Sequence, residues 1–154
     1  MNQPPVPAFP RPLDWRTVFG VPLTQFAPWL AVVLVATWGG YPGVVCVTPV
    51  AWLMALRVGL VCVERSRSGA RGQRLLEAAL AGALSGLLQG VLFWVIVPRV
   101  GPILPSEQAQ ANGLVLVMAL VGMLFGAALA LFSAYLREQR RAREEEKNIG
   151  GYAP

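Results

Sequence analysis

The chain has 154 residues, of which 55% are hydrophobic and only 14% are charged. Soluble proteins carry about one quarter charged residues, so this composition is typical of a membrane protein, and the length is that of one domain. The formal net charge is +5 and there is no histidine. The absence of imidazole excludes the usual haem ligand, histidine zinc sites and the commonest general base.

The first 22 residues, "MNQPPVPAFPRPLDWRTVFGVP", are rich in proline and interspersed with aromatic side chains. Proline disfavours a regular helix, so residues 1–22 are predicted to form an extended, partly polyproline leader on the cytoplasmic side. Two interpretations stay open. The leader is either disordered, or it is a strap that lies along a partner protein with Phe9, Trp15 and Phe19 as anchors.

Four apolar blocks follow within residues 23–136, and they carry almost no charge. The blocks are residues 23–38, 43–63, 75–97 and 112–136. A helix of about 20 apolar residues crosses the roughly 30 Å hydrocarbon core of a bilayer, and only the first block is shorter than that. The predicted fold is therefore all-α: a polytopic membrane protein with four transmembrane helices in an antiparallel bundle, the first helix being short. A re-entrant hairpin made by the first two blocks is the alternative.

The positions of lysine and arginine predict the orientation. With four crossings, all but two of the 13 basic residues lie before the first block, between the second and third, or in the tail, residues 137–154. Basic residues gather on the cytoplasmic side, so both termini are predicted to be cytoplasmic and the protein to be integral to a bacterial inner (plasma) membrane. The basic inner face predicts contact with anionic headgroups of the lipid bilayer rather than with nucleic acid.

Among the polar side chains inside the apolar blocks, three are candidates for a functional role: Arg57, Glu77 and Gln89. Arg57 and Glu77 have a similar inner depth on neighbouring helices. They either form an ion pair, or Arg57 extends to the headgroups while Glu77 faces water at a helix start. Gln89 lies near mid-membrane and is predicted to hydrogen-bond to a neighbouring helix. Trp52, at a similar depth, is expected to pack inside the bundle.

Small residues recur at every fourth position in the third and fourth blocks. They are Ala78, Gly82, Gly86 and Gly90 in the third block and Gly122, Gly126, Ala130 and Ala134 in the fourth. Counting inward from the outer ends matches these residues by depth: Gly86 with Gly122, Gly82 with Gly126, and Ala78 with Ala130. Small residues let helix backbones approach in lipid, so this glycine zipper predicts a close right-handed crossing of the two helices. A contact with another chain, or a pore, are the alternatives.

The sequence contains no recognisable catalytic arrangement. Its serines have no histidine base, and neither a phosphate-binding loop nor a nucleophile elbow is present. We therefore expect no enzyme activity, no cofactor and no metal site. The charged tail is predicted to continue the last helix and then fray, either as a solvated extension or as a docking handle.

Two functions remain from the sequence. The first is a non-catalytic structural or accessory subunit of a larger membrane complex, which fits the missing chemistry, the leader and the tail. The alternative is a small oligomeric transporter or channel whose polar path would run through Arg57, Glu77 and Gln89.

Overall fold

The computed structural model describes residues 12–38, 48–67, 70–100 and 108–150. These residues form four helices and no strand: α1 (Trp15–Thr37), α3 (Thr48–Arg65), α4 (Arg71–Val100) and α5 (Gln108–Gly150). Within the described residues, three spans are long and apolar enough to cross a membrane. They are Trp15–Ala36, Arg71–Leu92 and Leu116–Lys147. The all-helical fold and the apolar membrane-type helices agree with the sequence prediction.

Helix α3 does not belong to that group of three. It has 18 described residues, and Arg57, Glu64 and Arg65 are among them. The sequence prediction began the corresponding block at residue 43, and residues 43–47 lie outside the described part of the chain. A crossing by α3 therefore stays a prediction.

Helix α1 is longer than the sequence predicted. It has 23 residues and begins at Trp15, so a short first helix and an extended segment over residues 15–22 were both wrong. Asp14 is the cause, because its carboxylate caps the helix. It accepts hydrogen bonds from the Thr17 hydroxyl at 2.9 Å and the Thr17 backbone N–H at 3.4 Å. The Thr17 hydroxyl bond lowers the pKa of Asp14 below its usual range. Residues 1–11 of the predicted leader lie outside the described residues.

Two prolines inside α1, Pro22 and Pro28, do not end the helix. Membrane helices tolerate proline because neighbouring helices and hydroxyl side chains satisfy the backbone groups that proline leaves free. The carbonyl groups that lose a donor here are those of Val18 and Thr24, four residues before each proline. In the same stretch the Thr24 hydroxyl donates a hydrogen bond to the Val21 carbonyl oxygen at 2.9 Å. Pro22 is itself buried against the rest of the molecule, so its ring contributes to packing.

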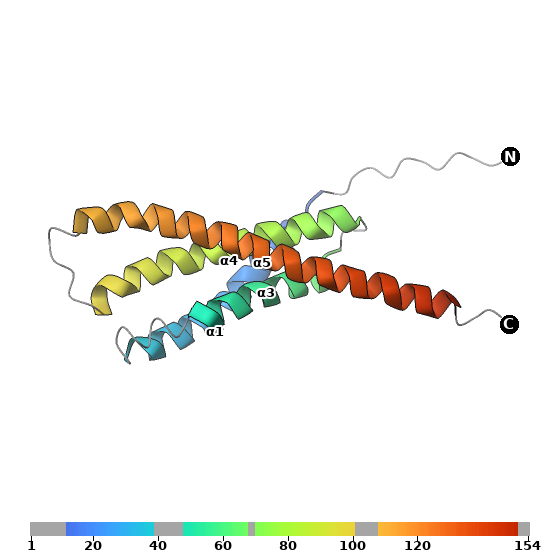
Figure 1. Ribbon diagram of the computed structural model, residues 1–154, viewed down its shortest axis with the longest axis horizontal. Coiled ribbons are helices and arrows are strands. Elements are labelled where there is room, and N and C mark those ends of the chain that lie inside the picture. The colour runs from blue at the N-terminus through green and yellow to red at the C-terminus, as the bar shows by residue number, and fades with distance from the viewer. Residues whose placement is uncertain (1–11, 39–47, 68–69, 101–107, 151–154) are drawn as a thin grey trace.

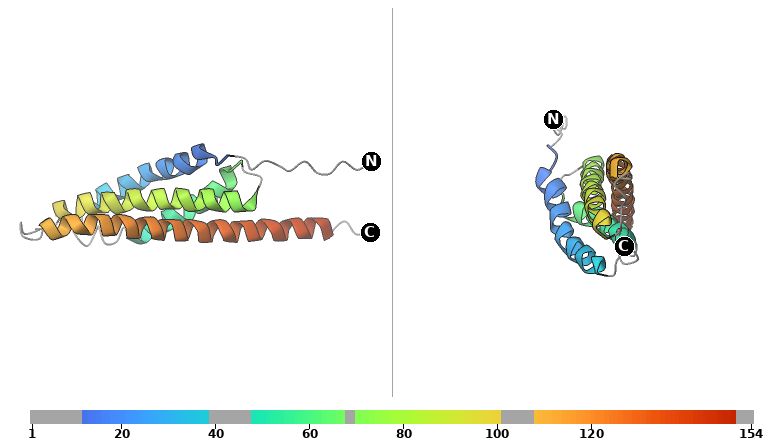
Figure 2. Two further views of the ribbon diagram at one scale, coloured as in Figure 1. Left: turned by 90° about the horizontal axis from the view of Figure 1, so that it is seen from above. Right: turned by 90° about the vertical axis from the view of Figure 1, so that its left-hand side faces the viewer.

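Helices α4 and α5 lie side by side and cross, while α1 and α3 lie together on one side of this pair (Figures 1 and 2). Helix α3 contacts each of the other three helices, and α1 contacts α3 and α4. The elements that frame any site are therefore the α4–α5 pair and the face that it presents to α3.

The core consists of two clusters of buried side chains. One joins all four helices and consists of Val21, Val58, Cys62, Val63, Ala78, Ala81 and Ala134. The other consists of Trp29 and Val33, with partly buried side chains of α3 and α4 packed around them. Most of the core residues are small, which lets the helices approach closely.

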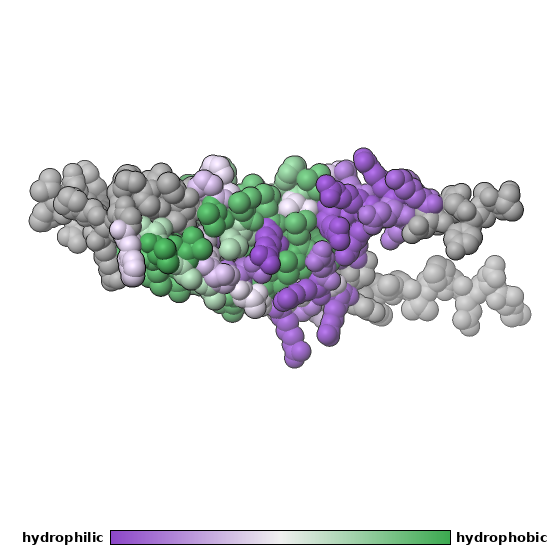
Figure 3. All heavy atoms as spheres, turned by 90° about the horizontal axis from the view of Figure 1, so that it is seen from below, coloured by the Kyte–Doolittle hydropathy of each residue, from purple (hydrophilic) through white to green (hydrophobic). Residues whose placement is uncertain are grey.

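Helix α5 continues as one helix through the charged tail to Gly150. Near the change from apolar to charged sequence, the Arg71 guanidinium lies over the Tyr135 ring, 5.4 Å from its centroid. Figure 3 shows apolar side chains over the middle of the molecule and hydrophilic ones gathered toward the end where the C-terminal part of α5 lies. The surface thus has an apolar body and one strongly polar end.

Candidate functional site

Helices α4 and α5 touch backbone to backbone along a row of small residues, which we call the seam. The backbones of Gly82 and Gly86 face those of Gly126 and Gly122. A Cβ added at Gly122 would lie 2.5 Å from the Gly86 carbonyl oxygen, which no real Cβ tolerates. Along the same seam, a Cβ at Gly90 would lie 2.8 Å from the Met118 carbonyl oxygen. From one contact to the next, the residue number therefore rises along α4 and falls along α5.

The alanines extend this seam toward the polar end of the molecule. Ala130 lies over Gly82, while Ala78 and Ala130 are both fully buried. The depth comparison placed Ala130 opposite Ala78, and that match stays a prediction. The hand of the crossing stays a prediction.

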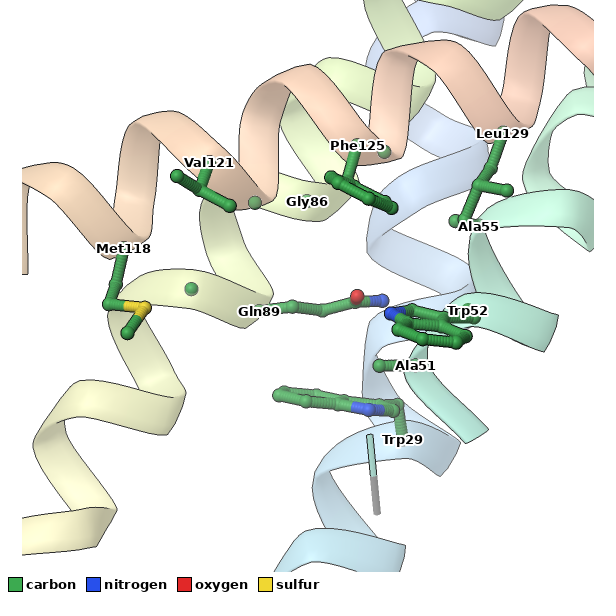
Figure 4. A pocket seen from close by; sticks show the side chains of 13 residues that line it. Trp29, Ala51, Trp52, Ala55, Gly86, Gln89, Met118, Val121, Phe125 and Leu129 are labelled. Atoms are coloured by element: carbon green, nitrogen blue, oxygen red, sulfur yellow. The ribbon is translucent and has the colours of Figure 1, made fainter. Parts of the chain in front are cut away.

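A cleft of about 270 Å³ borders the seam where α1, α3, α4 and α5 meet. Gly86, Gly90, Gly122 and Gly126 form one wall, and bulky apolar side chains form the others. In Figure 4 Trp29 and Trp52 lie across the cleft from Met118 and Val121. The Trp52 and Phe125 rings stack, with their centroids 6.3 Å apart. These glycines let α4 and α5 meet backbone to backbone at this wall, because a Cβ at any of them would collide with the facing helix.

Two polar groups belong to the cleft. The Gln89 side chain extends into it in Figure 4, and its amide nitrogen donates to the Ser85 hydroxyl at 3.3 Å. Trp29 is 2% exposed, and its indole Nε1–H has no acceptor within the described residues. The cleft therefore suits an apolar group, and it offers no charged side chain for chemistry among the residues that line it.

A second cluster, which we call the Glu77 cluster, joins Asp14, Ser66 and Glu77. Glu77 is completely buried. Its Oε1 accepts a hydrogen bond from the Asp14 backbone N–H at 2.9 Å, and its Oε2 accepts one from the Ser66 hydroxyl at 2.5 Å. A buried carboxylate needs such donors, because an unpaired buried charge is costly. One side chain of α4 thus holds the start of α1 and the residue after α3.

An ion pair between Arg74 and Glu138 joins α4 to α5 at the same end. The Arg74 Nε lies 2.7 Å from Glu138 Oε1, and its Nη2 lies 2.9 Å from Glu138 Oε2. The Glu138 side chain is 6% exposed. This two-bond geometry is the strongest arrangement available to arginine and a carboxylate. It ties the two helices together beyond the end of the small-residue seam.

The structure does not bring Arg57, Glu77 and Gln89 together. Arg57 is exposed, and no ion pair joins it to Glu77 within the described part of the chain. Glu77 is buried in its own cluster, and Gln89 lies in the cleft beside the seam. Of the two sequence interpretations for Arg57, its position fits the extended side chain rather than the pair.

Sequence reasoning missed several contacts that the structure makes. Gly59 lets α3 approach α5, since a Cβ there would meet the Ala130 backbone and the Ser133 hydroxyl. The Ser133 hydroxyl in turn lies 2.8 Å from the Leu56 carbonyl oxygen. A lone glycine shows no stripe, so no pattern marked Gly59. Extending the depth comparison beyond the apolar blocks would have brought Arg74 close to Glu138.

Three aromatic side chains on α1 and α3 are about half exposed. Trp52 is 52% exposed, so the prediction that it packs inside the bundle was wrong. Trp15 and Phe19 are also about half exposed, and their rings stack with centroids 5.8 Å apart on the first turns of α1. They are therefore helical residues rather than points along an extended strap. Phe9 lies outside the described residues.

No protein-family model, curated protein or solved structure matches this chain. Over the described residues, no three cysteine, aspartate or glutamate side chains gather in a way that would hold a metal ion.

Proposed function

We propose that the chain is a non-catalytic integral membrane protein that serves as a structural or accessory subunit of a larger membrane complex. The observation that carries this proposal is the separation of Arg57, Glu77 and Gln89. A transporter or channel needs polar groups that line one path. Here one lies at the surface, one is buried among hydrogen-bond donors and one lies in an apolar cleft.

The exposed apolar surface of α5 supports the same proposal. Leu116, Leu124 and Phe125 are each more than half exposed. Soluble monomers rarely expose contiguous apolar surface of this kind, which marks a membrane or protein contact. Together with the seam, which holds α4 and α5 in a fixed pair, this surface suits a protein that packs against lipid and other helices.

For the topology, we propose four crossings in an antiparallel bundle, with both termini in the cytoplasm. The Glu77 cluster, the Arg74–Glu138 pair and a 3.5 Å contact from Arg141 Nη1 to the Val63 carbonyl oxygen support one shared polar end. Basic residues of one membrane side would then meet. Helix α3 needs little lipid-facing surface, because α1, α4 and α5 all contact it. Its charged side chains, Arg57, Glu64 and Arg65, are exposed and lie in its C-terminal half, from which long side chains extend to the headgroups of the cytoplasmic side.

The topology predicts which single cysteines are accessible from outside. In a Cys46→Ser background, Ser106→Cys is expected to react with a membrane-impermeant maleimide in intact spheroplasts, because residue 106 joins the third and fourth crossings outside. Ser68→Cys is expected to react only after the membrane is permeabilised. Labelling of Ser68→Cys in intact spheroplasts would contradict four crossings with cytoplasmic termini.

If the chain is an accessory subunit, it is expected to co-purify with other polypeptides. Extracted from its native membranes in mild detergent, the tagged protein is expected to migrate in an assembly much larger than its own 16.6 kDa, with other subunits in constant ratio. Extraction in a harsh detergent is the control, since it should release the free chain. A small homo-oligomer that contains this chain alone, and that moves a solute when reconstituted in vesicles, would replace the proposal with the transporter alternative.

A further inference from the structure

A second hollow, the α3–α5 groove, lies between α3 and α5 near the polar end and has a volume of about 380 Å³. Its apolar lining comes from Leu56 and Leu60 on α3 and from Phe132 and Leu136 on α5. Its charged lining consists of Glu64, Arg137 and Arg140. The groove is separate from the cleft beside the glycine seam, and none of its residues lines that cleft.

The two walls of the groove change character along the same direction. Leu56, Leu60 and Glu64 follow one another at four-residue steps on one face of α3, and Phe132, Leu136 and Arg140 do the same on α5. Contacts between the helices rise together in residue number, from Leu56 with Ser133 to Val63 with Arg141. The groove is therefore apolar at one end and charged at the other.

Arg137 has hydrogen-bonding capacity to spare at the charged end. Its Nε is buried and has no acceptor within the described residues. Its Nη2 lies 3.4 Å from Glu64 Oε1, a contact between two partly exposed side chains. Arg140 is exposed beside it. Two arginines against one glutamate leave this end of the groove with one net positive charge, and guanidinium groups bind phosphate oxygens through several hydrogen bonds at once.

We propose that the α3–α5 groove binds one anionic phospholipid. An acyl chain lies along Leu60, Phe132 and Leu136, and the headgroup phosphate contacts Arg137 and Arg140. A free phosphate has no use for the apolar walls, and a neutral headgroup leaves the net positive charge unbalanced. The gradient from apolar to charged matches a lipid lying with its chain in the bilayer and its phosphate at the surface. The site requires only that the protein is in a membrane, so it does not depend on the accessory role.

The test uses the purified full-length chain in neutral detergent, with native mass spectrometry to count the bound lipids. With phosphatidylglycerol, one molecule per chain is expected to be retained, and phosphatidylcholine is expected to bind at least several-fold more weakly. Glycerol 3-phosphate, which has the phosphate without acyl chains, is expected neither to bind nor to compete. Competition by glycerol 3-phosphate would mean a phosphate site, and equal retention of both lipids would mean no headgroup recognition; either result overturns the proposal.

Two double variants distinguish lipid binding in the groove from a general attraction of anionic lipid to positive charge. The double variant Arg137→Gln with Arg140→Gln is expected to bind phosphatidylglycerol roughly thirtyfold more weakly, as the loss of two basic contacts predicts. Arg143→Gln with Lys147→Gln removes the same charge from exposed residues farther along α5, outside the groove lining, and is expected to bind like the wild type. An equal loss in both double variants would overturn the proposal.

Leu60→Trp provides an independent variant that keeps both arginines. Leu60 is partly exposed on the groove wall, so a larger side chain there fills the groove without entering the core. We expect retention of phosphatidylglycerol to fall while the thermal unfolding temperature without lipid stays the same. Unchanged retention in Leu60→Trp would contradict the proposed place of the acyl chain.

Discussion

Replacing Gly86 with leucine is expected to destabilise the protein by at least about 3 kcal/mol. A Cβ at this position would overlap the Gly122 carbonyl group, which is backbone and cannot rotate away as a side chain could. Overpacking against a flexible side chain costs about 1–3 kcal/mol, so an obstacle of backbone should cost more. Thermal unfolding of the purified chain in mild detergent measures the effect.

Gly20 provides the matched control, because it is also inside a helix and nothing lies within 4 Å of a Cβ added there. Gly20→Leu is expected not to destabilise the protein, and to raise the free energy of unfolding by up to about 1 kcal/mol, because leucine has nearly the helix propensity of alanine. Alanine sharpens the comparison: Gly20→Ala should stabilise by up to about 1 kcal/mol through helix propensity, whereas Gly86→Ala should destabilise. If the two alanine variants shifted the unfolding temperature in the same direction, a close seam at Gly86 would be wrong.

Replacing Arg74 with methionine is the second change with a large expected effect, a loss of about 3 kcal/mol of stability. Glu138 is 6% exposed and would lose both of its hydrogen bonds from Arg74, and the ion-pair partner left to it among the described residues is Arg141 at 3.9 Å. An unpaired carboxylate in such a position is far costlier than the pair is favourable. The same unfolding measurement in mild detergent applies.

The double variant Arg74→Met with Glu138→Met tests the reason for that loss. It removes the buried charge together with its partner, so it is expected to recover most of the stability that Arg74→Met loses. Glu64→Gln is the control for an exposed pair. Glu64 and Arg137 lie 3.4 Å apart and are both well exposed, so this variant should cost about 1 kcal/mol or less. A double variant as unstable as the single one would show that packing around Arg74, rather than the stranded charge, causes the loss.

The sequence was most informative where one physical constraint acts on a regular pattern. Apolar blocks predicted helices, and the depth comparison put Gly86 opposite Gly122 and Gly82 opposite Gly126; those backbones are in contact in the structure. The comparison by depth works because a row of small residues is needed on both helices at the places where their backbones meet. It carries no information about α3, where Gly59 alone makes the close approach to α5.

The sequence was least informative where one side chain decides the outcome. Asp14 starts α1 eight residues before the predicted start, and the prolines that indicated an extended leader are accommodated inside the helix. Glu77 was considered as a partner for Arg57 or for water, whereas it accepts hydrogen bonds from the Asp14 backbone and the Ser66 hydroxyl. Backbone and hydroxyl donors leave no charge pattern, so they could not be anticipated from charge spacing.

The buried Glu77 carboxylate has a consequence for the order of assembly during synthesis. Its bond to the Asp14 N–H joins residues 63 positions apart, so α1 leaves the ribosome long before the α4 side chain that holds its N-terminal end. Helix α1 can enter the membrane early, but its final position has to wait for α4. The seam then requires α5, the last helix made. The contacts of α1 and of the seam are therefore complete only after α4 and α5 have been made.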